Sequence, residues 1–300
     1  MPNTLAHLGI NGLITRKLIK QSDLLLIYLG ALIPDIPWIF QRAALAFIPN
    51  INPYDLRLYC VIQASLFLSV VLSAAIAFLF IDTNRTFIIF AVGSLIHLLL
   101  DSIEIKWANG VHLFAPFNWE LFNAGYFWPE NVFIYVLTVF GIIYLLFHWK
   151  EALSSSFNLS VKNITKLVLS FSCLIIYFSL PLIFLTNAEE ANNHFVQTLR
   201  GYEHRPGKYF EVDRGNYIND PGGDKYITPF NEELKISNLN LSTTGSMSIK
   251  AKFLSQDKIQ ILDYHIHSNR DIYSYIALLL LLALLIISFV KKTKFNLRSW

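Results

Sequence analysis

Apolar residues in this chain gather in long, nearly uncharged runs, and the length of a run predicts the element that it forms. A helix needs about 20 mostly apolar residues to cross ~30 Å of hydrocarbon. Runs that meet this requirement predict membrane-spanning helices at residues 58–81, 86–105, 131–149, 166–187 and 273–290. The pattern therefore indicates a polytopic membrane protein whose membrane part is all-α.

Two shorter apolar runs come before these spans. Residues 4–20 and 23–33 are each short for a full crossing, and Pro34-Asp35-Ile36-Pro37 halts the second run. A basic turn separates the two runs, which predicts a helical hairpin whose turn lies at a membrane surface. Residues 38–48 then predict an amphipathic helix that lies in the interface.

Residues 188–271 are polar and rich in Gly, Pro, Asn and Asp turn clusters. Alternating apolar and polar positions in 246–253 and 258–267 are typical of strands. This segment is long enough for a small β-rich module, because many domains of ~55–65 residues fold alone. The chain thus divides into a helical membrane domain (1–187), a β-rich module (188–271), and a final membrane helix with a basic tail (272–300).

The composition of the whole chain supports the membrane interpretation. Its 300 residues are 54% hydrophobic and only 15% charged, and the mean hydropathy is +0.45. The formal net charge of +3 is too small to indicate a nucleic-acid partner. No basic segment followed by an apolar core and a cleavage site opens the chain, so we expect no removable signal peptide.

The distribution of Lys and Arg over the short loops predicts the orientation, because cytoplasmic loops carry an excess of these residues. Only Arg42, Arg57 and Lys106 fall in one set of loops. The opposite set, which we expect to be cytoplasmic together with the C-terminus, contains Arg16, Lys17, Lys20, Arg85, Lys150, Lys162, Lys166, Lys291, Lys292, Lys294 and Arg298. The 106–130 loop and the 188–271 module are then extracytoplasmic.

An imidazole and two carboxylates interrupt one of the apolar spans. His97, Asp101 and Glu104 have the spacing that places side chains on one face of a helix. Ionisable residues inside a membrane helix are costly and are commonly functional. Nitrogen and oxygen ligands one helical turn apart can bind a single metal ion.

Helix rise brings a second pair of such residues to a similar depth. At ~1.5 Å per residue, His7 and Asp35 lie ~20 Å from the turn of the predicted hairpin, and His97 and Asp101 lie ~18 Å and ~24 Å from the inner end of their helix. Two histidines and two aspartates suit a divalent metal ion such as Zn²⁺, Mn²⁺ or Fe²⁺, and we expect zinc. The alternative is a polar cluster that only holds helices together.

Further polar residues are candidates for contacts at this site or elsewhere. Gln63 lies a few residues inside the span predicted at 58–81 and is expected to donate a hydrogen bond in the same layer. His112, in the outer loop, is a candidate ligand or substrate contact. His265 and His267 share one face of a predicted strand, which permits metal binding, but a solvated strand face is the expected explanation.

Four motifs within residues 1–120 carry a resemblance to a known family. They are Ala6-His7, Gly30-Ala-Leu-Ile-Pro34-Asp35-Ile, Gly93-Ser-Leu-Ile-His97-Leu-Leu-Leu-Asp101 and Gly110-Val-His-Leu-Phe-Ala-Pro116. In this order they resemble the motifs of the bacterial inner-membrane family called membrane-bound metal-dependent hydrolases. The resemblance implies metal-dependent hydrolysis at the cytoplasmic (inner) membrane of a bacterium.

The chain departs from that family at two places. Pro37 stands where the family's PDID motif has its second Asp. The segment Arg57-Leu-Tyr-Cys-Val-Ile-Gln63-Ala-Ser65 lacks both histidines of the family's HR-x-x-THS motif. These departures argue against a complete multi-metal centre.

Two functions from different classes remain. The first is an integral-membrane hydrolase of a lipid-linked or phosphoester substrate, with His7, Asp35, His97 and Asp101 as metal ligands and Glu104 as the catalytic proton acceptor. Its partners would be membrane lipids. The second is a non-enzymatic membrane assembly or transport factor that works through a protein partner of the outer β-rich module.

Overall fold

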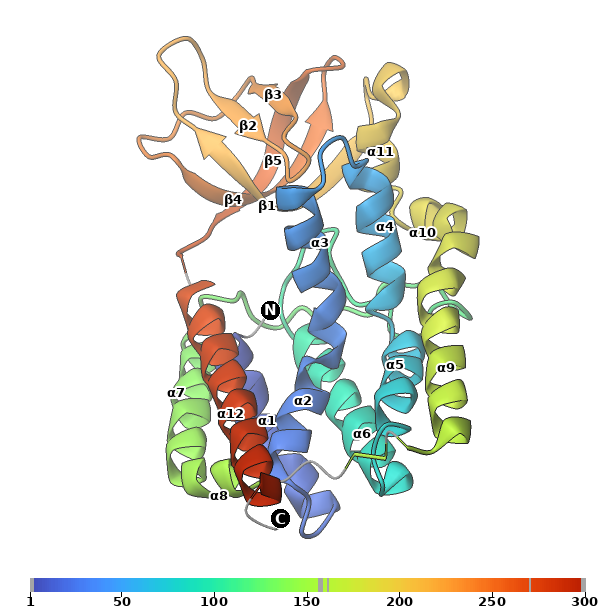
Figure 1. Cartoon of the computed structure of the whole chain (residues 1–300). Coiled ribbons are helices and arrows are strands. Elements are labelled where there is room, and N and C mark those ends of the chain that lie inside the picture. The colour runs from blue at the N-terminus through green and yellow to red at the C-terminus, as the bar shows by residue number, and fades with distance from the viewer. Residues whose placement is uncertain (1–2, 156–158, 161, 270, 298–300) are drawn as a thin grey trace.

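A computed structural model of the chain describes residues 3–155, 159–160, 162–269 and 271–297. Helices form the larger part, and a five-stranded β-barrel caps one end of them (Figure 1). The helices are α1 (Thr4–Leu18), α2 (Leu24–Leu32), the 3-10 helix η1 (Ile33–Asp35), α3 (Ile36–Phe47), α4 (Pro53–Gln63), α5 (Leu66–Ala77), α6 (Thr83–Ser102), α7 (Val132–Phe147), α8 (Trp149–Ser154), α9 (Ile164–Ile183), α10 (Leu185–Ala191), α11 (Val196–Arg200), the 3-10 helix η2 (Tyr202–His204) and α12 (Asp271–Leu297).

Several helices have the length and composition of membrane spans. Among the described residues, Leu24–Phe47, Thr83–Ser102 and Ile164–Ile183 are long and apolar enough to cross a membrane, and the bent pair α4–α5 raises the number from three to four. Val132–Phe147 and Ile272–Ser288 are shorter apolar helices. These spans indicate a membrane protein, in agreement with the hydropathy pattern.

The proline-containing segment ends α2 at Leu32, as predicted, but contrary to the prediction it does not end the span. α2, η1 and α3 follow one another from Leu24 to Phe47 as one candidate span. Pro34 and Pro37 fall in the first turns of η1 and α3. Proline is tolerated there because the first N–H groups of a helix have no helical partner in any case. The predicted interfacial helix at 38–48 therefore forms the half of this span that is nearer the barrel.

The span predicted at 58–81 is divided into two helices, which meet at an angle of 72°. α4 ends at Gln63, and the Ser65 side chain caps α5 by accepting a hydrogen bond from the Leu68 N–H at 3.4 Å. The Leu66 N–H donates to the Leu113 carbonyl at 3.3 Å instead of a helical partner. These two bonds replace the helical hydrogen bonds at the break.

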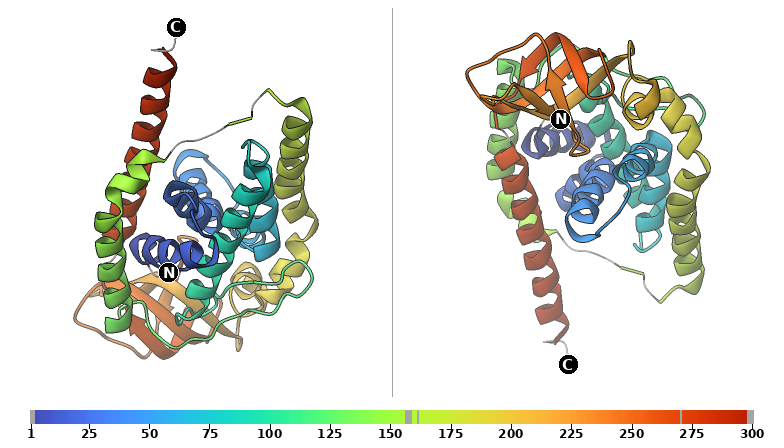
Figure 2. Two further views of the ribbon diagram at one scale, coloured as in Figure 1. Left: turned by 90° about the horizontal axis from the view of Figure 1, so that it is seen from below. Right: turned by 90° about the horizontal axis from the view of Figure 1, so that it is seen from above.

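α1 and α2 form the predicted helical hairpin and lie at the centre of the helical part. α7 and α12 flank the hairpin on one side, and α5, α6 and α9 lie on the other (Figure 2). The basic turn residues lie at the end farthest from the barrel. Arg85 donates to the Lys20 carbonyl at 2.8 Å, and Lys166 donates to the Phe80 carbonyl at 2.9 Å.

Glycines set the distance between α2 and α6. A Cβ on Gly93 of α6 would lie 3.0 Å from the carbonyl carbon of Gly30 and 3.1 Å from the Ala31 nitrogen. A Cβ on Gly30 would lie 2.9 Å from the Phe90 Cα. Small residues at such crossings let helix backbones approach closely inside a membrane. The same contact places His97, one turn beyond Gly93, against the end of α2.

The predicted β-rich module is a closed barrel with the strand order β1–β2–β3–β5–β4. β3 and β5 pair in parallel and the other neighbours are antiparallel. Closure gives each of the five strands a hydrogen-bonded neighbour on both sides. The strands are β1 (Tyr209–Ile218), β2 (Lys225–Ile227), β3 (Glu233–Ile236), β4 (Gly245–Phe253) and β5 (Lys258–Ile266).

The loop between α6 and α7, residues 103–131, joins the barrel to the helices. Asn109 Nδ2 donates to Asp213 Oδ2 on β1 at 2.9 Å, and the Ala108 N–H donates to Glu211 Oε2 at 3.0 Å. Because both acceptors belong to β1, this strand fixes the barrel over the outer ends of α3, α4 and α6.

Gly93→Val is expected to destabilise the helical part, since its side chain has no space against the α2 backbone. Overpacking of this kind costs about 1–3 kcal/mol. Thermal unfolding in detergent measures the effect as a lowered midpoint. Gly245→Ala is the control, because nothing lies within 4 Å of the Cβ that it adds. An unchanged midpoint for Gly93→Val would show that α2 and α6 separate at no cost.

Candidate metal centre

His7, Asp35, His97 and Asp101 meet between α1, α6 and the junction of η1 with α3. His7 Nε2 lies 3.2 Å from Asp101 Oδ1, and His97 Nε2 lies 3.5 Å from Asp35 Oδ1 and 3.8 Å from Asp101 Oδ2. The two imidazole rings stack with their centroids 3.8 Å apart. The four residues that were expected at one depth in the membrane are therefore neighbours.

All four side chains are withdrawn from solvent. The exposed fraction is 1% for His7, 7% for Asp35, 1% for His97 and 6% for Asp101. Carboxylates at this burial need a compensating charge or hydrogen bonds, because an unpaired buried charge costs several kcal/mol. The group is thus a constrained polar centre in an otherwise apolar helix bundle.

A backbone hydrogen bond fixes the tautomer of His97. Its Nδ1 lies 2.6 Å from the Ala31 carbonyl oxygen, which can only accept. The Nδ1 atom therefore carries the proton, and in the neutral ring the Nε2 lone pair faces Asp35 and Asp101. Metal-binding histidines commonly donate their other ring N–H to a carbonyl in this way.

Five polar atoms of this group have no hydrogen-bond partner among the residues that the structure describes. They are His7 Nδ1, His7 Nε2, Asp35 Oδ1, His97 Nε2 and Asp101 Oδ1. Such buried atoms cost about 1–3 kcal/mol each when they stay unsatisfied. Ligand atoms of His7, His97 and Asp101 lie within 4.8 Å of one another, so this triad could hold a metal ion. A cation there would satisfy several of these atoms at once.

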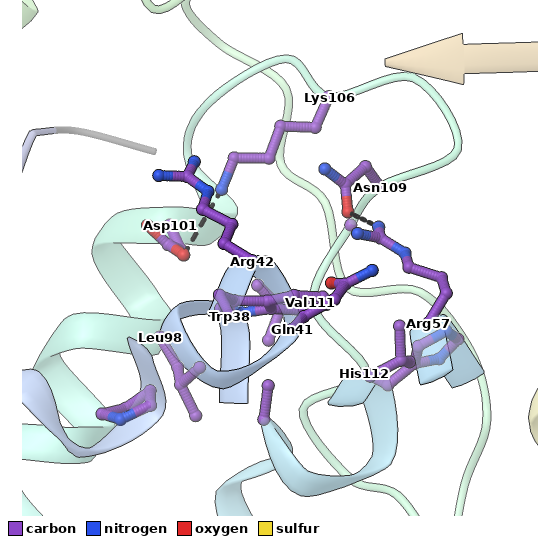
Figure 3. Close-up of a pocket in the computed structure, with 14 residues that line it drawn as sticks. Trp38, Gln41, Arg42, Arg57, Leu98, Asp101, Lys106, Asn109, Val111 and His112 are labelled. Carbon is purple, nitrogen blue, oxygen red and sulfur yellow. Dashed lines mark hydrogen bonds and ion pairs between the residues drawn. The ribbon is translucent and has the colours of Figure 1, made fainter. Parts of the chain in front are cut away.

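Lys106 lies at the outer side of the group. Its Nζ is 3.4 Å from Asp101 Oδ2, and its exposed fraction is 6% (Figure 3). The sequence analysis counted Lys106 only as a loop charge. Its position five residues after Asp101, at the end of the same apolar run, is the signal that could have linked the two.

A cavity of about 170 Å³ opens beside the centre and shares Asp101 with it (Figure 3). Three cationic side chains and one anionic side chain lie on its wall. The charged residues are Arg42, Arg57, Lys106 and Asp101. Because cations outnumber the carboxylate, the cavity favours an anionic ligand.

Contacts on two sides hold Arg57 at this cavity. Its guanidinium lies 4.6 Å from the centre of the Trp38 ring, and Arg57 Nη2 donates to Asn109 Oδ1. Planar stacking and directed N–H groups are the features with which arginine recognises carboxylates and phosphates. Arg57 belongs to the segment in which the two histidines of the HR-x-x-THS motif are missing. This segment therefore contributes a cation to the cavity and none of the motif's histidines.

Gln63 and His112 lie apart from the four-residue group. Gln63 Nε2 lies 3.3 Å from the Tyr59 hydroxyl and 3.4 Å from the Tyr177 carbonyl, facing α9. His112 lines the cavity, where its Nδ1–H donates to the Trp119 carbonyl at 2.9 Å and its Nε2 accepts from Asn192 at 3.2 Å. Burial lowers the pKa of His112 to about 4, so its ring is neutral at pH 7.

Glu104, expected as a proton acceptor, is fully buried at the end of α6. Its backbone forms a bridge with Phe127. It is neither a member of the triad nor one of the residues that line the cavity. The nearest carboxylate outside the triad is instead Asp35, which touches His97.

A second triad lies where the barrel meets the loop before α7. Glu130, His265 and His267 offer ligand atoms within 4.8 Å of one another and could also hold a metal ion. His265 lies in β5, whereas His267 follows the last residue of that strand, and at 8% exposure His267 is not on the solvated face that was expected. Glu130 was not a candidate in the sequence analysis, since it belongs to a loop far from β5 in the chain.

Comparison of the chain with protein-family models, curated proteins and solved structures finds no match. The resemblance to membrane-bound metal-dependent hydrolases therefore rests on the four motifs in the sequence. The function of the site has to be inferred from its own geometry.

His97→Asn and Asp101→Asn are each expected to lower the metal content by one equivalent per chain, because each removes a ligand atom of a buried triad. Elemental analysis by mass spectrometry of full-length protein without a histidine tag measures this. His148→Asn is the control, since His148 lies beside Glu151 at the C-terminal end of α7, away from the triad. Equal metal content in all four proteins would contradict a metal site at the triad.

Proposed function

We propose that the chain is an integral-membrane, metal-dependent hydrolase that cleaves a phosphoester of a lipid or lipid-linked substrate. One observation carries the proposal: Asp101 belongs both to the buried triad with His7 and His97 and to the wall of the cationic cavity. A metal centre and an anion-binding surface would then share one side chain, which would bring a phosphoryl group next to the metal.

His7, His97 and Asp101 would hold the metal, which we take to be zinc because two imidazoles and a carboxylate are a common catalytic zinc set. When bound, zinc lowers the pKa of a water ligand toward neutrality and polarises a phosphoryl oxygen. Three protein ligands would leave the ion open to both the water and the phosphoryl oxygen. The Ala31 carbonyl supports His97 in the orientation that this role needs.

Arg42, Arg57 and Lys106 would bind the phosphoryl oxygens of the substrate. Charge-assisted hydrogen bonds from such groups stabilise the negative charge that develops as water adds to phosphorus. The Trp38 ring beneath Arg57 limits the directions in which the guanidinium can turn. Lys106 would exchange part of its contact with Asp101 for a contact with the substrate.

Asp35 is the carboxylate that we assign as proton acceptor, in place of Glu104. It lies beside His97 and outside the three-residue triad, so a metal would leave its charge partly available. In the reaction the water oxygen bonds to phosphorus, its proton passes to Asp35, and the bond from phosphorus to the leaving alkoxide breaks. The alkoxide then takes the proton.

The proposed setting is the outer face of a bacterial cytoplasmic membrane. The basic residues Arg16, Arg85 and Lys166 gather at the end opposite the barrel. By the positive-inside rule this end and the C-terminus are cytoplasmic, and the barrel is extracytoplasmic. The cavity near the barrel end would then be reached from the outer leaflet, whose lipids carry phosphoester groups.

The alternative is a non-enzymatic assembly or transport factor that works through a protein partner of the barrel. The segment from Arg57 to Gln63 favours it, because this segment supplies a cavity cation and no metal ligand. A polar cluster without a metal would then serve only to hold α1, α2 and α6 together.

Asp35→Asn separates the roles assigned to the carboxylates. We expect it to retain zinc and to lower kcat about 10²- to 10⁴-fold, the usual contribution of a proton acceptor. Asp101→Asn should lose both zinc and activity. The assay uses zinc-loaded protein in mixed micelles of phosphatidic acid and phosphatidylglycerol, with released phosphate or glycerol phosphate quantified by mass spectrometry.

Arg57→Gln provides the matched test of the cavity. It should raise KM about tenfold or more while zinc content stays constant, because a charged hydrogen bond contributes ~1.5–3 kcal/mol. Arg16→Gln, which removes a cation at the other end of the molecule, should leave KM unchanged. Zinc-loaded wild type without turnover on either lipid would contradict a phospholipid hydrolase and favour the assembly factor.

A further inference from the structure

The cluster of Glu130, His265 and His267 lies outside the site described so far. Glu130 lies in the loop that precedes α7, His265 is the last residue but one of β5, and His267 follows the end of that strand. His265 Nε2 lies 3.1 Å from Glu130 Oε2, and His267 Nδ1 lies 3.1 Å from Glu130 Oε1. One carboxylate thus faces two imidazole nitrogens, one with each oxygen.

The surroundings of His267 fix which of its nitrogens carries the proton. Its Nε2 lies 2.7 Å from Ser248 Oγ, which also accepts from the Arg214 N–H at 3.1 Å and lies 2.9 Å from Asp213 Oδ1. Hydrogen bonds from Asn109 and Ser248 and the charge of Arg214 outweigh burial and lower the pKa of Asp213, so its carboxylate only accepts. Ser248 therefore donates its one hydrogen to Asp213, and His267 Nε2–H donates to Ser248.

This assignment leaves Nδ1 of His267 facing a carboxylate oxygen. With Nε2 donating to Ser248, Nδ1 lies 3.1 Å from Glu130 Oε1. A ring nitrogen and a carboxylate oxygen keep this distance when a proton or a metal ion lies between them. Two ligands of one tetrahedral zinc ion lie ~3.3 Å apart, since zinc-to-nitrogen and zinc-to-oxygen bonds are ~2.0–2.1 Å.

We propose that Glu130, His265 and His267 form a second zinc site, which fastens the barrel to the loop before α7. The hydrogen-bonded sequence from His267 through Ser248 to Asp213 is the support that a metal-bound histidine commonly has. Two imidazoles and one carboxylate complete three positions of a tetrahedral ion, and water or a fourth ligand takes the last.

An aromatic wall gives this site its shape and leaves an entrance. The Trp128 ring stacks on His265 with a centroid distance of 3.8 Å and an interplanar angle of 4°, and Trp107 meets Trp128 edge to face. The side chains of His265 and Glu130 are 25% and 16% exposed, whereas that of His267 is 2% exposed. An ion can therefore enter from the His265 side and bind against a rigid inner wall.

The site stands apart from the proposed hydrolase centre, and a His97→Asn background separates the two. Full-length His97→Asn protein without a histidine tag, stripped with chelator and titrated with Co²⁺ alone, should show the visible absorption of tetrahedral cobalt at one equivalent. Adding His267→Asn or Glu130→Gln should abolish this band. In the zinc-loaded wild-type background the same two substitutions should remove one equivalent of zinc and reduce the zinc-dependent rise in unfolding midpoint, since the triad of His7, His97 and Asp101 keeps its own ion.

His204→Asn is the matched control, because His204 is an exposed histidine beside the same barrel. It should retain both the cobalt band and the zinc equivalent. The proposal is overturned if His97→Asn protein binds no metal, or if Glu130→Gln and His267→Asn bind as much as their parent. A zinc-loaded wild type that hydrolyses neither lipid, together with an intact cobalt band in His97→Asn protein, would refute the hydrolase alone.

Discussion

The close approach of α2 and α6 is the constraint on which the candidate centre depends. Gly30 and Gly93 let the two backbones meet, and the contact brings the His97 ring to the Ala31 carbonyl. That carbonyl lies in the last turn of α2, where helical partners run out. Its partner in a 3-10 turn would be Pro34, which has no N–H to donate. The carbonyl that orients His97 thus lies at the end of the helix, where the chain passes into the proline-containing segment.

This arrangement explains which parts of the centre could be predicted from the sequence. The depths of His7, Asp35, His97 and Asp101 follow from helix rise alone, because a helix is rigid and its residues advance by a fixed step. Given these depths, the correct pairing of α1 with α2 in a hairpin was enough to predict that the four side chains meet. The prolines misled the prediction of the second element, since their effect depends on whether they fall in the first turn or the interior of a helix.

Contacts between distant, irregular segments could not be predicted in this way. Glu130 meets His265 and His267 across separations of 135 and 137 residues, from a loop to a strand. No local periodicity encodes such a pair. Barrel closure could not be predicted from local periodicity either. The parallel pairing of Lys235 with Lys258 depends on long-range packing and not on the alternation within either strand.

The cavity beside the first centre and the second triad are linked by a continuous series of polar contacts. Arg57 donates to Asn109, Asn109 to Asp213, Ser248 to the same carboxylate, and His267 to Ser248. The residues that seat the barrel on the loop are therefore the ones that hold a cavity cation in place. Removal of the barrel would leave Asn109 without its carboxylate, so the barrel and the cavity form one structural unit.

Charge balance connects the metal to the anion that the cavity favours. With both histidines neutral, Asp35 and Asp101 contribute two negative charges and Lys106 one positive charge, which leaves an excess negative charge in a poorly solvated place. A divalent cation reverses this excess to a positive one. An anionic group in the cavity then neutralises it, so the cation and the anion each lower the cost of burying the other. We therefore expect a metal ion and an anionic ligand to bind to such a centre cooperatively, with Asp101 as the shared side chain.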